Sequence, residues 1–146
     1  MKTALSYNTK EKNQVIIITN DLEQLIKKSR IKNGTLFAYS LHTTLSLMIQ
    51  EASEPNLCQD FIKQLKKIVD DDGRKYQHTC AKHPSGTCEE DKANGPSHVR
   101  QLITNQNLII DIKNGKLNLG QWQDVALLEL DGPRQGREIV IKIIKD

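Results

Sequence analysis

The sequence lacks an apolar run long enough to cross a membrane. Its longest apolar runs, such as residues 139–144, are of strand length, and that one carries Lys142, whereas a membrane-spanning helix needs about 20 apolar residues. Residues 1–5 show no apolar signal region, so we expect a cytoplasmic protein without a membrane partner. Three cysteines, an odd number, favour reduced thiols over a disulfide framework.

Aromatic residues and clustered basic residues are also scarce. Aromatic side chains make up 4% of the chain, and the lysines are dispersed, with short pairs at 27–28 and 66–67. Nucleic-acid-binding proteins more often combine a basic stripe with interleaved aromatic residues, so we expect no nucleic-acid partner. A nucleophile elbow, a glycine-rich phosphate loop and a dinucleotide fingerprint are likewise missing, and none of the enzyme classes that they mark is indicated.

The chain contains enough hydrophobic residues to form one core. Of its 146 residues 37% are hydrophobic, which is ordinary for a globular protein, and no repeat or low-complexity linker divides the sequence. We therefore expect a single compact domain over residues 1–146. Alternating or β-rich patterns predict extended structure at 15–19, 35–50, 107–112, 116–119, 125–130 and 138–144, with Asn114-Gly115 as a hairpin turn between the third and fourth of these.

Three helices are expected between these strands. The first is capped by Asp21 and ends near Gly34. The second begins near Ser53 and ends at 70–73. The third begins at 94–96, where Pro96 suits a first turn. A core-facing stripe on the second helix is predicted from apolar residues at helical spacing, Leu57, Phe61, Leu65 and Ile68. Because helices interrupt the strands irregularly, an α+β fold with a mixed or antiparallel sheet is favoured over a doubly wound parallel sheet.

The residues suited to chemistry lie near turns and element ends. Residues 42–51 offer the His42 imidazole, three hydroxyl groups and the Glu51 carboxylate, although a hydrogen-bonded strand end would look the same. Residues 94–98 place Asn94 and His98 at a helix N-terminus, where free N–H groups attract anions; simple capping is the alternative. The helix dipole there disfavours a charged imidazole, which suits a neutral base or metal ligand.

A long polar segment, residues 73–95, carries further donors. Cys80, His83 and Cys88 follow His78 and supply zinc-type ligand atoms, but without the tight spacing of structural zinc sites. Incidental reduced cysteines are therefore favoured over a separate zinc loop. Segments of this length inside a compact domain are uncommon and often functional.

Six motifs in order give the chain a family resemblance. They are His42-Thr43-Thr44-x-Ser46-Leu47, Glu51, Tyr76-x-His78, Pro96-Ser97-His98, Gly115-x-Leu117-x-x-Gly120-x-Trp122-Gln123 and Glu129-x-Asp131-Gly132-Pro133-Arg134. Together they resemble the YjbQ-like family, whose members are described as secondary thiamine-phosphate synthase enzymes. The resemblance implies a small α+β domain, a homotrimer with one polar site per subunit, and a secondary activity that joins a pyrimidine diphosphate to a thiazole phosphate.

The chain departs from the family pattern at a few positions. Gln50 stands where asparagine is usual, Gln121 where threonine is usual and Asp124 where glycine is common. The first two replacements keep the ability to form hydrogen bonds. Residues 79–92, with their cysteines, are peculiar to this chain.

These observations lead to an expected function. We expect an enzyme that acts on phosphorylated small molecules, a transferase of the thiamine-phosphate synthase type. Its alternatives are a non-catalytic trimer that binds a metal or phosphate, and a metal-dependent hydrolase. The expected cofactor is a divalent metal, zinc or magnesium: imidazole ligands suit zinc, whereas diphosphate departure suits magnesium.

Each expected site residue has an assigned role. His42, His78 and His98 are expected to converge as metal ligands, and His42, Glu51 and His98 to act in catalysis. The expected substrate-binding residues are Thr44, Ser46, Asn94, Ser97 and Arg134. Arg134 suits a phosphate, with a turn pairing to Asp131 as its alternative, and Trp122 is expected in the core or at a trimer interface.

Overall fold

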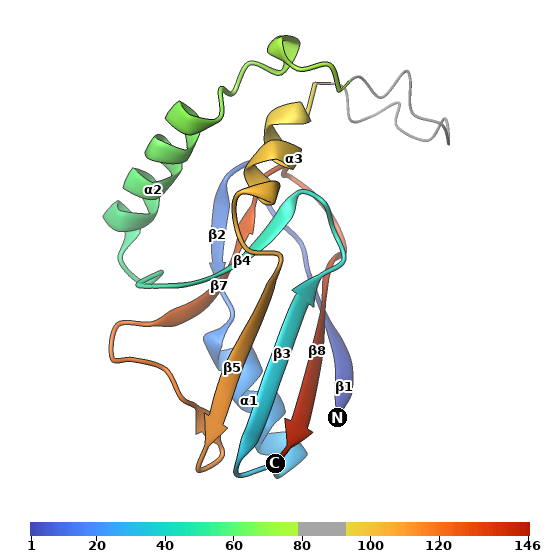
Figure 1. Ribbon diagram of the computed structural model, residues 1–146, viewed down its shortest axis with the longest axis vertical. Coiled ribbons are helices and arrows are strands. Elements are labelled where there is room, and N and C mark those ends of the chain that lie inside the picture. Colours follow the sequence, from blue (N-terminus) through green and yellow to red (C-terminus); the bar gives the residue numbers. More distant parts are fainter. Residues whose placement is uncertain (79–92) are drawn as a thin grey trace.

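The computed structural model describes residues 1–78 and 93–146 and shows an α+β fold, as expected from the sequence (Figure 1). The strands of these residues form two sheets in which the neighbouring strands are antiparallel. The five-stranded sheet has the order β1 (Lys2–Tyr7), β8 (Arg137–Lys145), β3 (Gly34–Ser40), β5 (Asn107–Lys113) and β6 (Lys116–Leu117). The three-stranded sheet has the order β2 (Gln14–Ile17), β7 (Asp124–Glu129) and β4 (Leu45–Gln50).

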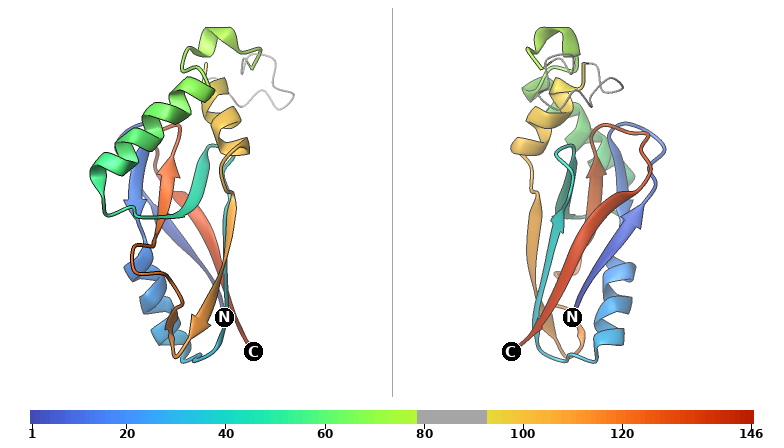
Figure 2. Two further views of the ribbon diagram at one scale, coloured as in Figure 1. Left: turned by 60° about the vertical axis from the view of Figure 1, so that its left-hand side comes forward. Right: turned by 90° about the vertical axis from the view of Figure 1, so that its right-hand side faces the viewer.

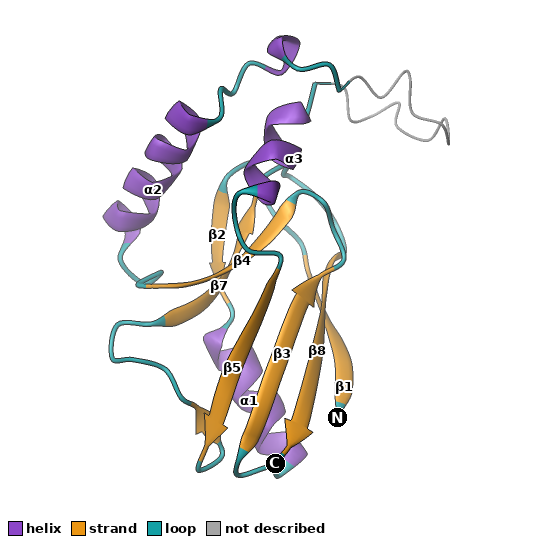
Figure 3. Cartoon of the chain, viewed as in Figure 1, coloured by secondary structure: helices purple, strands orange, loops and turns teal. Residues whose placement is uncertain are grey.

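Within the described ranges, three α-helices accompany the sheets. Figure 3 distinguishes helices, strands and loops by colour. The helices are α1 (Thr19–Ser29), α2 (Pro55–Ile68) and α3 (Gly95–Leu102), with a short 3-10 turn, η1 (Gly73–Lys75), between the last two. Helix α1 lies behind the five-stranded sheet in the view of Figure 1, while α2 and α3 lie toward the other end of the molecule (Figures 1 and 2). Within the described ranges no helix is long and apolar enough to span a bilayer.

The main core forms between α1 and the inner faces of both sheets. Leu22 and Ile26 of α1 are fully buried and cluster with Leu36 of β3 and Ile141 of β8. Leu127 of β7 belongs to the same cluster, so the two sheets share one core. The alternation of buried and exposed residues along β3 and β5 is the period-2 pattern of strands with one covered face.

The structure corrects several predicted elements. Residues 35–50 form two strands in different sheets rather than one extended segment, and β1, which was not predicted, pairs with β8. Asp21 does not cap α1 but accepts a hydrogen bond from the Tyr7 hydroxyl at 2.8 Å. The helix ends at Ser29, before the predicted exit at Gly34, because Arg30 takes a left-handed conformation.

The predicted apolar stripe of α2 is only partly correct. Leu65 is buried as expected, but the other buried residue of this helix is Cys58. Phe61 and Ile68 are exposed, at 39% and 73%. The helix is therefore rotated relative to the prediction, so that part of its apolar surface faces outward.

Three further expectations concern individual positions. Trp122 is not a core residue, because 67% of it is exposed; its expected place at a trimer interface stays a prediction. The predicted hairpin turn is confirmed, since Asn114 and Gly115 both have positive φ. The expectation for Cys80, His83 and Cys88 falls outside the described residues.

Candidate functional site

A polar pocket lies where the chain passes from one sheet to the other. It has a volume of about 340 Å³. One wall is the loop that joins β3 to β4, a second is the start of α3, and the third is the segment between β7 and β8. The lining residues are Leu41, His42, Thr43, Thr44, Asn94, His98, Asp131, Arg134, Gln135 and Arg137.

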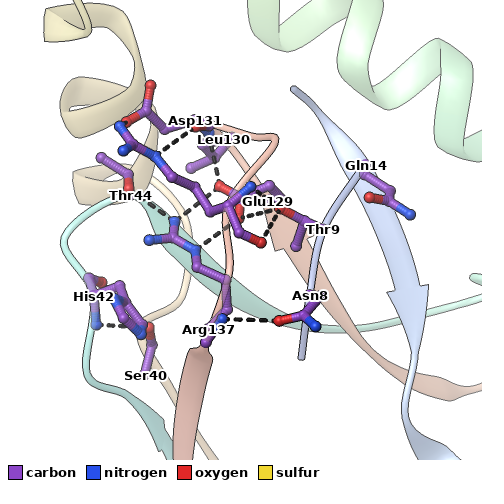
Figure 4. Close-up of polar contacts among 12 residues, drawn as sticks. Asn8, Thr9, Gln14, Ser40, His42, Thr44, Glu129, Leu130, Asp131 and Arg137 are labelled. Carbon is purple, nitrogen blue, oxygen red and sulfur yellow. Dashed lines mark hydrogen bonds and ion pairs between the residues drawn. The ribbon is translucent and has the colours of Figure 1, made fainter. Parts of the chain in front are cut away.

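A buried ion pair borders the pocket, because Arg137 both lines it and pairs with Glu129 (Figure 4 shows the pair). The Arg137 Nε lies 2.6 Å from the Glu129 Oε2, and the two side chains are 6% and 0% exposed. Arg137 also donates to the Glu129 Oε1 and to the Thr44 hydroxyl, both at 2.8 Å. Thr9 donates to the Glu129 Oε2 at 3.1 Å. A charge this deeply buried is stable only when it is paired and hydrogen-bonded, and this pair meets both conditions.

The ion pair is linked to the wall that carries Asp131. The Asp131 backbone N–H donates to the Glu129 Oε1 at 2.8 Å. The Asp131 carboxylate accepts hydrogen bonds from the Asn94 amide at 3.0 Å and from the Arg134 guanidinium at 2.7 Å. The alternative interpretation of Arg134, a turn arginine paired with Asp131, is thus confirmed. Arg134 nevertheless lines the pocket, with 30% of its side chain exposed.

His42 is held in place by two hydrogen bonds. Its backbone N–H donates to the Ser40 hydroxyl at 3.1 Å, and its Nε2 accepts from the Glu138 backbone N–H at 2.8 Å. Burial and then the nearby Arg137 charge lower the pKa of His42, against smaller opposing effects of Glu129 and Glu138. The imidazole therefore favours its neutral form.

His98 lies in the first turn of α3, as the sequence predicts, and meets His78. The ring centroids of these two residues are 4.7 Å apart in an edge-on arrangement. Burial, followed by the charge of His78, lowers the pKa of His98, while Asp131 opposes the shift. A neutral imidazole was expected here; desolvation is the principal cause, rather than the helix dipole.

The predicted three-histidine metal site is not assembled within the described part of this chain. In residues 1–78 and 93–146, no group of three or more His, Cys, Asp or Glu side chains is placed to hold a metal ion. His78 and His98 adjoin each other, but the Nε2 of His42 is already bonded to the β8 backbone. The residues present thus offer two neighbouring imidazoles, which is an incomplete set for zinc.

Three predicted site residues lie away from the pocket. Ser46 hydrogen-bonds to the Thr104 hydroxyl beneath a separate apolar groove. Ser97 is fully buried and donates to the Leu130 carbonyl at 2.7 Å, which fastens α3 to the end of β7. Glu51 follows β4 at the end opposite to Thr44, roughly 20 Å along the strand at about 3.3 Å per residue. The pocket of this chain does not include them.

Arg137 is not among the site residues predicted from the sequence. A signal for it exists, because Arg137 has the same parity as the buried residues Ile139, Ile141 and Ile143 of β8. An arginine on the inward face of a strand requires a partner, and Glu129, on the inward face of β7, is that partner. The two unusual residues were therefore predictable as a pair.

Comparisons with known proteins place this arrangement in a family. The family model described as UPF0047 protein YjbQ-like matches residues 3–146. The chain belongs to this family. A UPF0047 protein of Archaeoglobus fulgidus is 29% identical over 136 residues, which cover 93% of this chain and 96% of that protein. One from Methanocaldococcus jannaschii is 30% identical over 138 residues, covering 94% and 90%.

Solved structures of the YjbQ-like family share the fold. A crystal structure of a YjbQ/UPF0047 family protein from Clostridium acetobutylicum has a TM-score of 0.80 and 30% identity, and covers 97% of this chain and 99% of that one. A YbjQ-like protein of unknown function from Sulfolobus solfataricus has a TM-score of 0.84 and 25% identity, with 100% and 97% covered. These likenesses establish family and fold, and no specific activity follows from them.

Proposed function

We propose that the pocket binds the phosphate group of a small phosphorylated molecule, and that the protein is a transferase of the thiamine-phosphate synthase type. The observation that carries the proposal is the gathering of His42, His98 and Arg134 around one concave polar site. Guanidinium and imidazole N–H groups are suited to phosphate oxygens. The family resemblance supplies the candidate substrates, a pyrimidine diphosphate and a thiazole phosphate.

The charges of the pocket residues favour an anion that binds together with a proton. Arg137 is neutralised by Glu129, and Arg134 by Asp131, so the four charges balance. Both pocket histidines have lowered pKa values. A bound phosphate would stabilise a charged His98, so binding should take up a proton and strengthen as the pH falls toward 6.

In the proposed reaction, a few side chains of the pocket each have a separate role. The bond between the pyrimidine-bearing carbon and the diphosphate breaks as the bond to the thiazole ring forms, and the departing diphosphate gains negative charge. Arg134 is positioned to donate hydrogen bonds to that charge, and His98 to supply or accept a proton at a phosphate oxygen. Thr44 lines the pocket, but its hydroxyl accepts from Arg137, so its proposed part is to keep that guanidinium in place.

We also propose that the site binds a divalent metal, zinc or magnesium. Its support is the adjacent pair His78 and His98 and the Asn94 Oδ1, which is buried and has no hydrogen-bond partner among the described residues. Elemental analysis of wild-type protein and of His98→Ala tests it. Equal metal content in both would exclude His98 as a ligand.

Two measurements test the proposed function. The first is inorganic phosphate and diphosphate binding by calorimetry at pH 6 and pH 8, for wild type, Arg134→Gln and the exposed control Arg74→Gln. We expect tighter binding at pH 6 and a roughly 10-fold or greater loss in Arg134→Gln, because a hydrogen bond to a charged group contributes about 1.5–3 kcal/mol. Unchanged affinity in Arg134→Gln would refute the phosphate site.

The second measurement is diphosphate release from the two thiamine precursors. Turnover that is lost in His98→Gln supports the transferase. Phosphate binding without turnover would instead indicate the non-catalytic binding protein, and release of phosphate from simple phosphoesters would indicate the hydrolase. The homotrimer implied by the resemblance also remains a proposal.

A further inference from the structure

The apolar groove above Ser46 is a second cavity, larger than the candidate pocket. It lies between α2 and β4, and in Figures 1 and 2 the helix runs alongside the three-stranded sheet. Its volume is about 520 Å³, which is within the range of roughly 300–1,000 Å³ that small-molecule sites occupy. The lining residues are Ser46, Leu47, Met48, Ile49, Gln50, Leu57, Asp60, Phe61, Gln64, Ile103, Thr104, Asn105 and Leu128, and none of them lines the candidate pocket.

One wall of the groove is a single face of α2. Leu57, Asp60, Phe61 and Gln64 follow one another at the spacing i, i+3, i+4 and i+7, which places them on one side of a helix. Leu57 and Phe61 belong to the apolar stripe that the sequence predicts as core-facing. The structure buries Leu65 of that stripe and leaves Phe61 on the groove wall, with 39% of it exposed. Apolar surface that a closed core would have covered is therefore open to a ligand.

The floor of the groove is dry and rigid. Leu47 of β4 and Leu128 of β7 form it, and both are fully buried. Their strands pair directly, with Leu47 opposite Leu127 and Ser46 opposite Leu128. Concave apolar surface beside an exposed aromatic ring is typical of sites for flat organic molecules. The groove therefore suits an aromatic or other apolar ring better than a fully polar metabolite.

The charge of the groove specifies the second half of such a ligand. Asp60 is the one charged residue among those that line it. The Asp60 side chain is exposed, and within residues 1–78 and 93–146 no hydrogen bond or ion pair engages its carboxylate. Helix α3 ends at Leu102, and the residues that follow it, 103–105, form the opposite wall. Because a helix C-terminus carries partial negative charge, both walls favour a cation and disfavour an anion.

The edge of β4 favours a compact ligand over a peptide. This strand is at the edge of its sheet, where an extended peptide can add as a further strand. However, the Leu47 N–H already donates to the Asn105 carbonyl at 2.8 Å. The free edge is thus interrupted in the middle of the groove, and an added strand has no continuous ladder to join.

We infer that the apolar groove binds a small organic cation, whose ring lies against Phe61 and Leu47 and whose ammonium or amidinium group meets the Asp60 carboxylate. This inference does not rest on the proposed function, because the two cavities share no lining residue.

The test uses four compounds that separate the ring from the charge. They are 2-naphthylmethylamine, the neutral 2-naphthylmethanol, the anion 2-naphthoate and methylamine, which has the charge without the ring. Calorimetry at pH 7 should give the tightest binding for the naphthyl amine, weaker binding for the alcohol, and none for methylamine. Naphthoate should bind least among the three naphthyl compounds. Amide NMR shifts caused by the amine should concentrate at residues 46–50, 57–64 and 103–105.

Two variants assign the two halves of the ligand. Asp60→Asn should lower the affinity for the amine by about threefold or more, a modest change because the carboxylate is exposed, and should leave the alcohol unaffected. Phe61→Ala should lower the affinity for both compounds roughly 10-fold. The matched controls are Asp111→Asn and Ile109→Ala, which replace an exposed carboxylate and an exposed apolar residue of β5 outside the groove. Neither control should change binding, and circular dichroism checks that all four variants are folded.

Each of the other outcomes contradicts a stated part of the inference. Equal affinity for the amine and the alcohol, unchanged in Asp60→Asn, would exclude a cation as the ligand class. A loss in Ile109→Ala but not in Phe61→Ala, or NMR shifts outside the groove, would show that the compounds bind elsewhere. Absence of binding by every naphthyl compound would overturn the site itself. Phosphate binding is measured separately, so its absence would end the proposed function and leave the result for the groove standing.

Discussion

Glu129 and Arg137 connect three parts of the chain through one buried pair. Because Glu129 is fully buried, Glu129→Gln should leave the Arg137 guanidinium without its counter-charge. Removing one member of a buried pair typically costs about 3–5 kcal/mol. We expect a loss of that order in the free energy of unfolding, measured by urea titration followed by circular dichroism.

The control for this prediction lies on β8 itself. Glu138 is exposed, so Glu138→Gln should change the free energy of unfolding by no more than about 0.5 kcal/mol. Replacing both buried partners by apolar residues, as in Glu129→Leu with Arg137→Met, should restore part of the loss. Equal stability of Glu129→Gln and Glu138→Gln would contradict the role given to the buried pair.

The pocket histidines predict a pH dependence of stability. His42 and His98 have lowered pKa values in the folded protein, chiefly through burial, whereas in the unfolded chain they titrate near 6.5. Below that pH the unfolded state binds more protons than the folded state, so the free energy of unfolding should fall as the pH decreases through 6.5 and below. Above it, this contribution is constant.

Urea midpoints between pH 8 and pH 5 check this prediction on metal-free protein. A double variant, His42→Asn with His98→Asn, should show a smaller decrease across that range. The idea fails if wild type and the double variant follow the same curve. Added phosphate should flatten the wild-type curve, since it stabilises the charged imidazole.

At the scale of elements, α2 and α3 are tied together by one arginine. Arg100 of α3 is fully buried, and it donates to the Asp71 carboxylate at 2.9 Å and to the Val69 carbonyl at 2.8 Å. Although burial raises the pKa of Asp71, the hydrogen bond from Lys12 and the charges of Lys12 and Arg100 lower it to about 2. The segment after α2 is thus fixed to α3 and to the turn before β2.

Asp71→Asn should weaken this connection. We expect a loss of about 1–3 kcal/mol in the free energy of unfolding, toward the lower end because Asp71 is 40% exposed. Asp72→Asn is the matched control, because its partner Arg74 is largely exposed. Hydrogen exchange should show faster opening of α3 in Asp71→Asn and not in Asp72→Asn; the reverse order would refute the proposed connection.

The strands of the last third were predictable, whereas the helix faces were less so. Asn114-Gly115 and the alternation of residues 107–112 depend on local geometry, and both predictions hold. The face of α2 depends on which side the sheet approaches, and Cys58 rather than Phe61 meets it. Strand β1 alternates weakly and is defined by its pairing with β8, which no local pattern reveals.

At the scale of the whole molecule, residues that are close in the sequence lie at opposite ends of the three-stranded sheet. Glu51 was expected beside His42, but β4 carries it to the far end of the sheet. We therefore predict that Glu51→Gln leaves the phosphate affinity of the pocket within about twofold of wild type, because a charge roughly 20 Å away is largely screened at physiological ionic strength. Calorimetry with inorganic phosphate measures this.

Arg134→Gln serves as the positive control in the same experiment. A large loss of phosphate affinity in Glu51→Gln would show that the residue reaches a pocket after all, and only a neighbouring subunit could bring it there.

The sequence identified His42, His98, Asn94 and Arg134 as pocket residues, because each lies at an element end. It could not separate Glu51 and Ser46 from them, because the break between β3 and β4 is set by the pairing of β4 with β7.

The hydrogen bond between His42 and the first residues of β8 has a consequence for the chemistry of the pocket. Since the Nε2 accepts the Glu138 N–H, the neutral ring must carry its hydrogen on Nδ1. This tautomer presents a donor and no free lone pair on the ring. His42 is then fitted to give a hydrogen bond to a bound oxygen and unsuited to remove a proton, so the role of base falls to His98.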